Sequence, residues 1–190
     1  MEINMPDGVI VALIAGGVAL AVAYVNSFLA ESYRRFRDGS ALAASLAGEL
    51  AAYEPAWPTI VNMLDTIITA VDSNSRKTTY LRPIERPRDF VYEDAVKKLG
   101  LLGTHLSENV VFVYSNIGAF RIAMEIIARN EKEMSDEELK LRCIGCREAV
   151  TRAGAKGSVL IKDLRERANK PFVPEWPWAA WIALLSRYPI

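Results

Sequence analysis

VIVALIAGGVALAVAYVNSFLA, residues Val9 to Ala30, is a stretch without any charged side chain, and its most polar residue is Asn26. About 20 apolar residues in helical form cross the ~30 Å hydrocarbon core of a bilayer. Inside that core the backbone has to satisfy its own hydrogen bonds, which an α-helix does. The stretch therefore predicts one transmembrane helix over residues 9–30.

Two other interpretations of the stretch are a cleavable signal peptide and a buried core helix. Ala21-Val22-Ala23 has the small-x-small form of a cleavage site. The leader, residues 1–8, holds Glu2 and Asp7 and no basic residue, whereas a signal peptide begins with a positively charged region. A core helix of this composition would be unusually apolar on every face. We therefore expect a retained span.

The residues that flank the span predict its orientation. Arg34, Arg35 and Arg37 follow it closely, and the segment before it is acidic. Because an excess of basic residues marks the cytoplasmic side of a span, we expect the remainder of the chain to lie in the cytoplasm.

Small residues recur within the span at four-residue spacing. Ala15, Ala19 and Ala23 form one row, and Gly17 and Ala21 are interpreted as an adjacent row. Such rows let two helix backbones approach closely in lipid, so they predict self-association or pairing with another membrane helix. The alternative is that alanine and glycine are simply common in membrane spans.

Helical periodicity continues after the span and predicts an all-α protein, with a cytoplasmic bundle of about five helices over residues 31–170. Apolar residues recur at spacings of three and four. Pro55 and Pro58 are expected to end the first helix of the bundle, because proline disrupts a helix interior. The expected helices cover residues 31–53, 59–71, 90–100, 106–129 and 135–168.

Four motifs give finer predictions. Asp38-Gly39-Ser40 is a point where the helix that follows the span is expected to weaken, by a break or a new N-cap. Gly100 is expected to close a short helix in the left-handed conformation. Ser135 and Glu138 match a capping box. The glycine pair 154 and 157 is expected to kink or split the last helix.

One part of the chain resembles a known pattern. FVYEDAVKKLGLL, residues 90–102, is followed by a turn and by NVVFVYSNI, residues 109–117. This resembles a group of small, mostly uncharacterised bacterial proteins that have one N-terminal span and a helical cytoplasmic domain. The resemblance implies the same layout here and supplies no catalytic residue.

Cys143 and Cys146 form a C-x-x-C motif inside an expected helix. A thioredoxin-like site would need the motif after a strand, at the start of a helix. A structural zinc site needs four ligands, and His105 is the only histidine in the chain. We interpret the two cysteines as small core residues, and we expect no metal and no cofactor.

Charge and motif content also narrow the function classes. Lysine and arginine together number 23, as do aspartate and glutamate, so the balance gives no case for nucleic acid as a partner. The sequence has no phosphate-binding glycine loop and no nucleophile elbow. Enzymatic activity is therefore not expected.

The C-terminal segment, residues 171–190, differs from the rest in composition. Trp176, Trp178 and Trp181 are followed by Ile182, Leu184 and Leu185. The apolar part is too short to span a bilayer. Two interpretations remain open: an interfacial segment, since tryptophan prefers the headgroup zone, and a docking segment that packs on the bundle or on a neighbouring subunit.

These features predict a single-pass protein of the inner membrane that acts as a non-enzymatic scaffold or accessory subunit. Its partners would be the lipid bilayer and either another protein or further copies of itself. The alternative is an oligomeric pore-forming or membrane-perturbing effector of a bacterial defence or toxin system.

Overall fold

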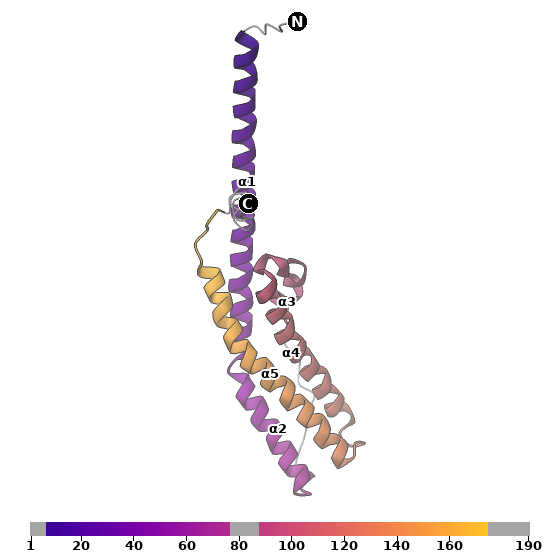
Figure 1. Ribbon diagram of the computed structural model, residues 1–190. Coiled ribbons are helices and arrows are strands. Elements are labelled where there is room, and N and C mark those ends of the chain that lie inside the picture. Colours follow the sequence, from indigo (N-terminus) through magenta and orange to yellow (C-terminus); the bar gives the residue numbers. More distant parts are fainter. Residues whose placement is uncertain (1–6, 77–87, 175–190) are drawn as a thin grey trace, which may run out of the picture. The chain divides into compact units, whose positions relative to one another are not determined.

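A computed structural model describes residues 7–76 and 88–174 of the chain (Figure 1). Within these ranges the secondary structure is helical and no strand occurs, which confirms the all-α prediction. The elements are α1 (Asp7–Tyr53), α2 (Ala56–Asp72), α3 (Phe90–Ala95), the 3-10 helix η2 (Val96–Leu102), α4 (Thr104–Asn130) and α5 (Asp136–Asn169).

The chain divides into two compact units. The first unit comprises Met1–Asp38 and Pro171–Ile190, and the second unit comprises Gly39–Lys170. Helix α1 is continuous from Asp7 to Tyr53, so its N-terminal part belongs to the first unit and its C-terminal part to the second.

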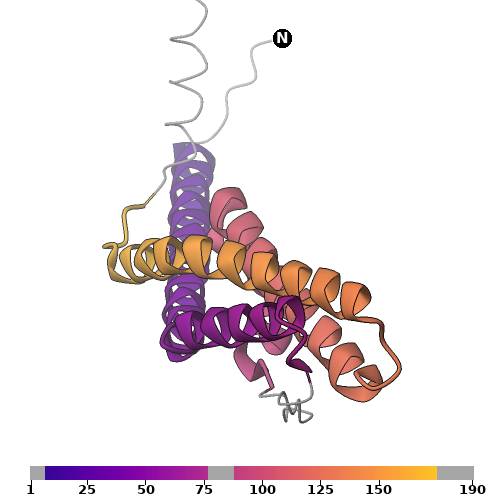
Figure 2. The ribbon, with the colours of Figure 1, turned by 90° about the horizontal axis from the view of Figure 1, so that it is seen from below.

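In the second unit α2 lies antiparallel to α5, and Figures 1 and 2 both show the two helices side by side. Asp65 pairs with Arg147 at 2.9 Å, and Asp72 pairs with Lys140 at 2.6 Å. The step from Asp65 to Asp72 equals the step back from Arg147 to Lys140, seven residues in each helix. Seven residues are close to two helical turns, so both pairs lie along the same seam.

Arg76, just beyond α2, extends this seam to the turn that joins α4 and α5. Its guanidinium donates to the Met134 carbonyl oxygen at 2.8 Å and to Asp136 at 2.8 Å, and it also reaches the Glu131 carbonyl oxygen. One cation, Arg76, thus satisfies two carbonyl groups that follow the C-terminus of α4. It also satisfies a carboxylate in the first turn of α5.

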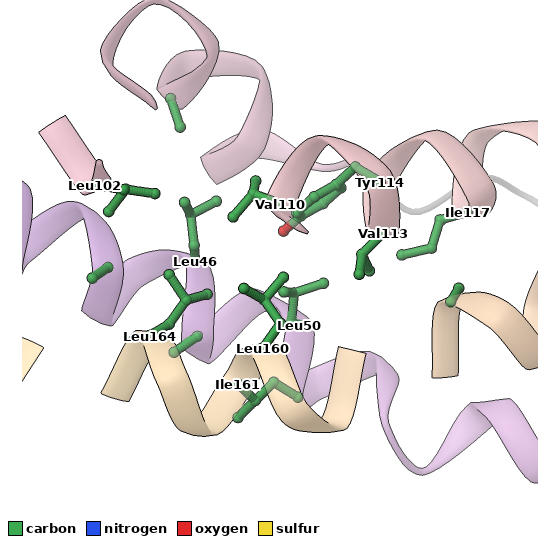
Figure 3. Packing of buried hydrophobic residues seen from close by; sticks show 14 of the residues in the cluster. Leu46, Leu50, Leu102, Val110, Val113, Tyr114, Ile117, Leu160, Ile161 and Leu164 are labelled. Atoms are coloured by element: carbon green, nitrogen blue, oxygen red, sulfur yellow. The ribbon is translucent and has the colours of Figure 1, made fainter. Parts of the chain in front are cut away.

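The core of the second unit consists of two hydrophobic clusters. In the larger cluster, α1 supplies Leu46 and Leu50, which lie among apolar side chains of α4 and α5 (Figure 3). The smaller cluster joins α2 to the end of α4 and the start of α5. Its buried members are Leu64, Ile67, Val71, Met124, Ile127, Met134, Leu139, Cys143 and Cys146.

Two helical runs are long and apolar enough to cross a membrane by length and composition, one beginning at Val11 in α1 and the other being α4. They differ in burial: none of the apolar window in α1 is buried, against 33% of that in α4. Helix α4 places Val110, Val113 and Ile127 in the two core clusters. Its apolar composition is therefore that of a core helix of the second unit.

The expected weak point at Asp38-Gly39-Ser40 is wrong, because α1 runs through it without interruption. Gly39 is buried, and a Cβ atom at this position would lie 2.8 Å from the Leu101 carbonyl oxygen. Such a distance is shorter than any ordinary contact. The glycine is required by the close approach of η2 to α1 and does not mark a helix end.

The left-handed cap lies three residues beyond the predicted one. The described glycine with a positive φ is Gly103, at 84°, and the 3-10 helix η2 carries the chain past Gly100 to Leu102. Ser107 stabilises the corner, because its hydroxyl oxygen lies 2.5 Å from the Leu99 carbonyl oxygen and 2.8 Å from that of Gly103, and its one hydrogen is donated between them.

Helix α5 begins as predicted and does not split as predicted. The Ser135 hydroxyl accepts from the Glu138 backbone N–H at 3.1 Å, which confirms the N-cap. Gly154 and Gly157 lie inside one continuous helix against the indole of Trp57. A Cβ at Gly157 would collide with the Trp57 ring, so these glycines make room for an aromatic side chain of α2.

Candidate functional site

The apolar half of α1, defined as residues 8–30, is the first candidate site because of its exposure. Val11, Leu13 and Leu20 are 65%, 63% and 74% exposed. Continuous exposed apolar surface of more than a few hundred Å² marks a contact with lipid or with protein. Among the described residues, no side chains bury this half of α1, which indicates an apolar environment of another kind.

Helical geometry decides which small residues share a face of α1. Successive residues turn by about 100°, so Ala15, Ala19 and Ala23 fall within an arc of roughly 80°, and Asn26 falls inside the same arc. Gly17 and Ala21 lie on the opposite side of α1 from Ala19, and not beside it as predicted, because residues two apart do not share a face. We call the face of Ala15, Ala19, Ala23 and Asn26 the alanine face.

The three predicted membrane-flanking arginines lie on α1 directly after its apolar half. Arg34 pairs with Glu31 at 2.9 Å, Arg35 with the same carboxylate at 3.6 Å, and Arg37 with Asp38 at 3.8 Å. The arginine side chains are 66–71% exposed. Exposed pairs of this kind contribute little to stability, so the guanidinium groups remain available to a charged surface.

An aromatic cluster surrounds the same part of α1. The ring centroid of Phe172 lies 5.3 Å from that of Tyr33 and 5.4 Å from that of Phe36, in edge-on and tilted arrangements. The residues that follow α5 thus contact α1 within the first unit. The predicted docking residues Trp176, Trp178 and Trp181 lie outside the described residues.

A polar network in the second unit is a second candidate site, and its first half centres on Glu49 of α1. The carboxylate accepts from the Val91 N–H at 3.0 Å, the Tyr92 N–H at 3.2 Å and the Tyr114 hydroxyl at 2.6 Å. The two N–H groups belong to the first turn of α3, which has no intrahelical acceptors for them. Glu49 therefore caps α3 from another helix, where its charge also complements the helix dipole.

The second half of the network centres on Asp89, which precedes α3. Its carboxylate accepts from the Tyr53 hydroxyl at 2.6 Å and forms a two-pronged ion pair with Arg121 of α4, one prong at 3.0 Å. The side chains of Arg121 and Asp89 are only 17% and 15% exposed. The Arg121 guanidinium also lies 5.4 Å from the centroid of the Tyr53 ring. Such pairs are strong because both charges are hydrogen-bonded in a fixed geometry.

The network connects helices, and its buried polar atoms are paired. Tyr92 and Tyr114, which both donate to Glu49, stack with ring centroids 3.9 Å apart and planes 4° from parallel. Among the described residues, every buried side-chain nitrogen or oxygen has a hydrogen-bond partner. Within those residues no group of three or more histidine, cysteine or acidic side chains is placed to hold a metal ion. The arrangement fixes α1, α3 and α4 to one another.

Sequence analysis missed this network, although two signals pointed to it. Glu49 falls next to Leu50 on the apolar side of its helix, and Arg121 lies directly between the apolar residues Phe120 and Ile122 of its helix. A charged side chain in either place needs a partner. The partners could not be named from the sequence. Val91 lies 42 residues beyond Glu49, and no local pattern in the sequence says which residues of the two segments come into contact.

Alkaline titration tests the environment of Tyr53. Burial and the hydrogen bond to Asp89 raise the pKa of Tyr53 from 10 to about 12. Between these values the folded state keeps a proton that the unfolded state has lost, so the free energy of unfolding should fall as pH rises from 10 to 12. Chemical denaturation at several pH values measures the decline.

Tyr53→Phe should flatten part of that decline, whereas Tyr33→Phe, outside the network, should not. A residual slope is expected because burial also raises the pKa of Tyr92, and burial and the hydrogen bond to Glu49 raise that of Tyr114. Equal slopes for wild type and Tyr53→Phe would refute the assignment.

The cysteine pair lies in the smaller core cluster, as the sequence predicted. Cys143 and Cys146 are 0% and 1% exposed, and burial raises the pKa of each thiol to about 11. We expect a thiol reagent at neutral pH to label neither residue in the folded protein and both in denaturant, at least ~100-fold faster, since the thiolate is the reactive form. Mass spectrometry after a labelling pulse measures this. Ser45→Cys, on an exposed surface, is the reactive control.

Comparison with known proteins leaves the chain without an assigned family. No protein-family model, no curated protein and no solved structure matches it.

Proposed function

We propose that this protein is a single-pass, membrane-anchored and non-enzymatic scaffold or accessory subunit of an inner-membrane complex. The apolar half of α1 would be its one transmembrane helix, and the second unit a cytoplasmic helical bundle. The observation that carries the proposal is that none of the apolar window in α1 is buried within the described structure, since a lipid core provides an apolar environment for it.

Two further features support the topology. The arginines at positions 34, 35 and 37 follow the apolar half directly, which favours a cytoplasmic location for everything after them. Helix α4 is long and apolar enough to span, but its side chains already form the core and hold Asp89 through Arg121.

The alanine face offers the helix–helix contact that a scaffold would use. Its small side chains allow close backbone approach, and Asn26 supplies an amide that can hydrogen-bond across a pair of helices in lipid. A second copy of α1 presents the same face, so a homo-oligomer is the simplest assembly.

Cross-linking in native membranes followed by blue-native electrophoresis tests the assembly. Replacing Ala15, Ala19 and Ala23 by isoleucine should shift the protein from oligomer to monomer. The matched control replaces Gly17 and Ala21, on the opposite side of α1, by isoleucine as well. This control should leave the oligomer intact. A wild-type protein that runs as a monomer with no co-purifying protein would overturn the proposal.

The second candidate, an oligomeric pore-forming or membrane-perturbing effector, is favoured by one observation. Asn26 and Ser27 place polar groups inside the apolar half of α1, and polar residues in a span commonly face a water-filled path or a helix partner. Induced expression should then depolarise the cells. A scaffold predicts no change in membrane potential.

A further inference from the structure

Helix α4 carries more apolar surface than the core of the second unit covers. Only 33% of its apolar window is buried. Val111 is 43% exposed, Phe112 44% and Ile122 56%. Contiguous exposed apolar surface marks a contact with another molecule. The uncovered side of α4 is therefore a candidate interaction surface.

The uncovered residues form one continuous face along α4. At about 100° per residue, its apolar and small side chains fall within an arc of roughly 100°. We call this the outer face of α4, and it consists of Val111, Phe112, Ser115, Ala119, Ile122 and Ile126. Core residues such as Val113, Ile117 and Met124 lie on the opposite side. From Phe112 onward the outer-face residues recur at alternating steps of three and four, which is typical of a helix that packs lengthwise against another helix.

The two ends of the outer face carry opposite charges. Glu108 lies at its N-terminal end, and Arg129, whose side chain is 70% exposed, lies at its C-terminal end. The charged residues between them are Arg121 and Glu125, and neither falls on the outer face. A parallel second copy would bring like charges together, whereas an antiparallel copy brings Glu108 to Arg129 at both ends. Charge complementarity of this kind selects the orientation of a pair.

The register that matches these charges also matches the apolar side chains. In an antiparallel pair related by a two-fold axis, residues at equal distances from the axis face each other. The axis that pairs Glu108 with Arg129 passes between Gly118 and Ala119. Two further pairs share this midpoint, namely Val111 with Ile126 and Ser115 with Ile122. The outer face is therefore complementary to itself along its length.

The smallest side chains lie where two copies would come closest. Helices that pack lengthwise are about 8–10 Å apart, and small residues at the contact favour the shorter distance. A Cβ atom added at Gly118 would have no neighbour within 4 Å. Packing within its own chain therefore does not require a glycine at this position, whereas close approach of a second α4 beside Ala119 does.

We infer that two copies of this chain pair through the outer faces of α4, in antiparallel orientation about a two-fold axis between Gly118 and Ala119. The partner is a second copy because the charges, the apolar residues and the small residues of the outer face share one midpoint. The contact lies within the second unit, so it depends neither on insertion of α1 nor on the alanine face.

Disulfide cross-linking of the full chain tests the pairing. Oxidation is carried out on gently prepared cell extracts that retain their membranes, and dimers are measured by non-reducing electrophoresis. Ala119→Cys should cross-link, because its two copies are offset along the helices by only about 1.5 Å. Glu108→Cys alone should give at least tenfold less dimer, because its two copies lie roughly 30 Å apart in an antiparallel pair. A disulfide joins Cα atoms only about 4–7 Å apart.

Co-expression tests the register. Chains that carry Glu108→Cys should cross-link to chains that carry Arg129→Cys, since these positions face each other. The wild type should give no dimer, because Cys143 and Cys146 are 0% and 1% exposed. Efficient cross-linking of Glu108→Cys with itself would overturn the antiparallel orientation.

Matched variants assign the contact to the outer face. In the Ala119→Cys background, Ile122→Lys should lower the cross-linked fraction at least fivefold, because it places a charge in the contact twice. Leu141→Lys, at a side chain of α5 that is 63% exposed, should leave it unchanged. Gly118→Leu should act like Ile122→Lys. Its control is Gly145→Leu, since an added Cβ at Gly145 also has no neighbour within 4 Å.

The outcomes separate this inference from the proposed function. Cross-linking at Ala119→Cys should persist when Ala15, Ala19 and Ala23 are replaced by isoleucine, and its loss there would overturn the inference. Absence of the Ala119→Cys dimer from a protein that still runs as an oligomer overturns this inference alone. A cross-linked protein that carbonate releases from the membranes overturns the proposed function and supports the pairing.

Discussion

Replacing Asp89 by alanine is expected to lower the free energy of unfolding by up to about 3–5 kcal/mol, the usual cost of leaving a fully buried charge without its partner. Arg121 is only 17% exposed and would lose both prongs of its ion pair. Tyr53 would lose its hydrogen-bond acceptor at the same time. Denaturant unfolding followed by far-UV circular dichroism measures the loss.

The control is Glu148→Ala, which removes an exposed pair with Arg152. The two side chains are 57% and 54% exposed, so a loss of no more than about 0.5 kcal/mol is expected. The double variant Asp89→Ala, Arg121→Met should recover part of the stability, since no charge then stays buried. A similar, small loss in Asp89→Ala and Glu148→Ala would contradict the role assigned to the network.

Lysine at both Val18 and Leu20 is expected to release the protein from the membrane fraction. Each lysine near the centre of a span costs about 2.5–3.5 kcal/mol of insertion free energy, so the pair costs roughly 5–7 kcal/mol. Both side chains are more than half exposed, so the substitutions remove little packing among the described residues. Fractionation and carbonate extraction measure the released protein.

The matched control exchanges the same two positions for apolar residues, Val18→Leu with Leu20→Val, and should stay in the membrane. The helical circular dichroism of the second unit should survive in both variants. An extraction profile of the lysine variant identical to that of the control would show that α1 is held by something other than the hydrocarbon core.

Local signals predicted most of the helices because each depends on a few neighbouring residues. Pro55 and Pro58 end one helix and begin the next, and Ser135 with Glu138 starts α5. Such helix ends can be predicted without knowing the fold, because the proline ring and the capping hydroxyl act on the neighbouring backbone.

The glycines were predicted less well because their role depends on distant partners. Gly39 meets the Leu101 carbonyl, and Gly157 meets the indole of Trp57, a contact across 100 residues of chain. A glycine that ends a helix cannot be told from the sequence alone from a glycine that lets another part of the chain pack closely against the helix. The same reasoning applies to Glu49, whose three donors come from α3 and α4.

The contact between α2 and α5 also affects the order in which the helices pack while the chain is being synthesised. Asp65 and Arg147 are separated by 82 residues, whereas α4 and α5 are joined by a short turn. At a synthesis rate of about 5–20 residues per second, α2 leaves the ribosome roughly 4–16 s before its partner is complete. During that interval the apolar face formed by Leu64, Ile67 and Val71 has no α5 to cover it. The α4–α5 hairpin, which closes a much smaller loop, should form before α2 docks.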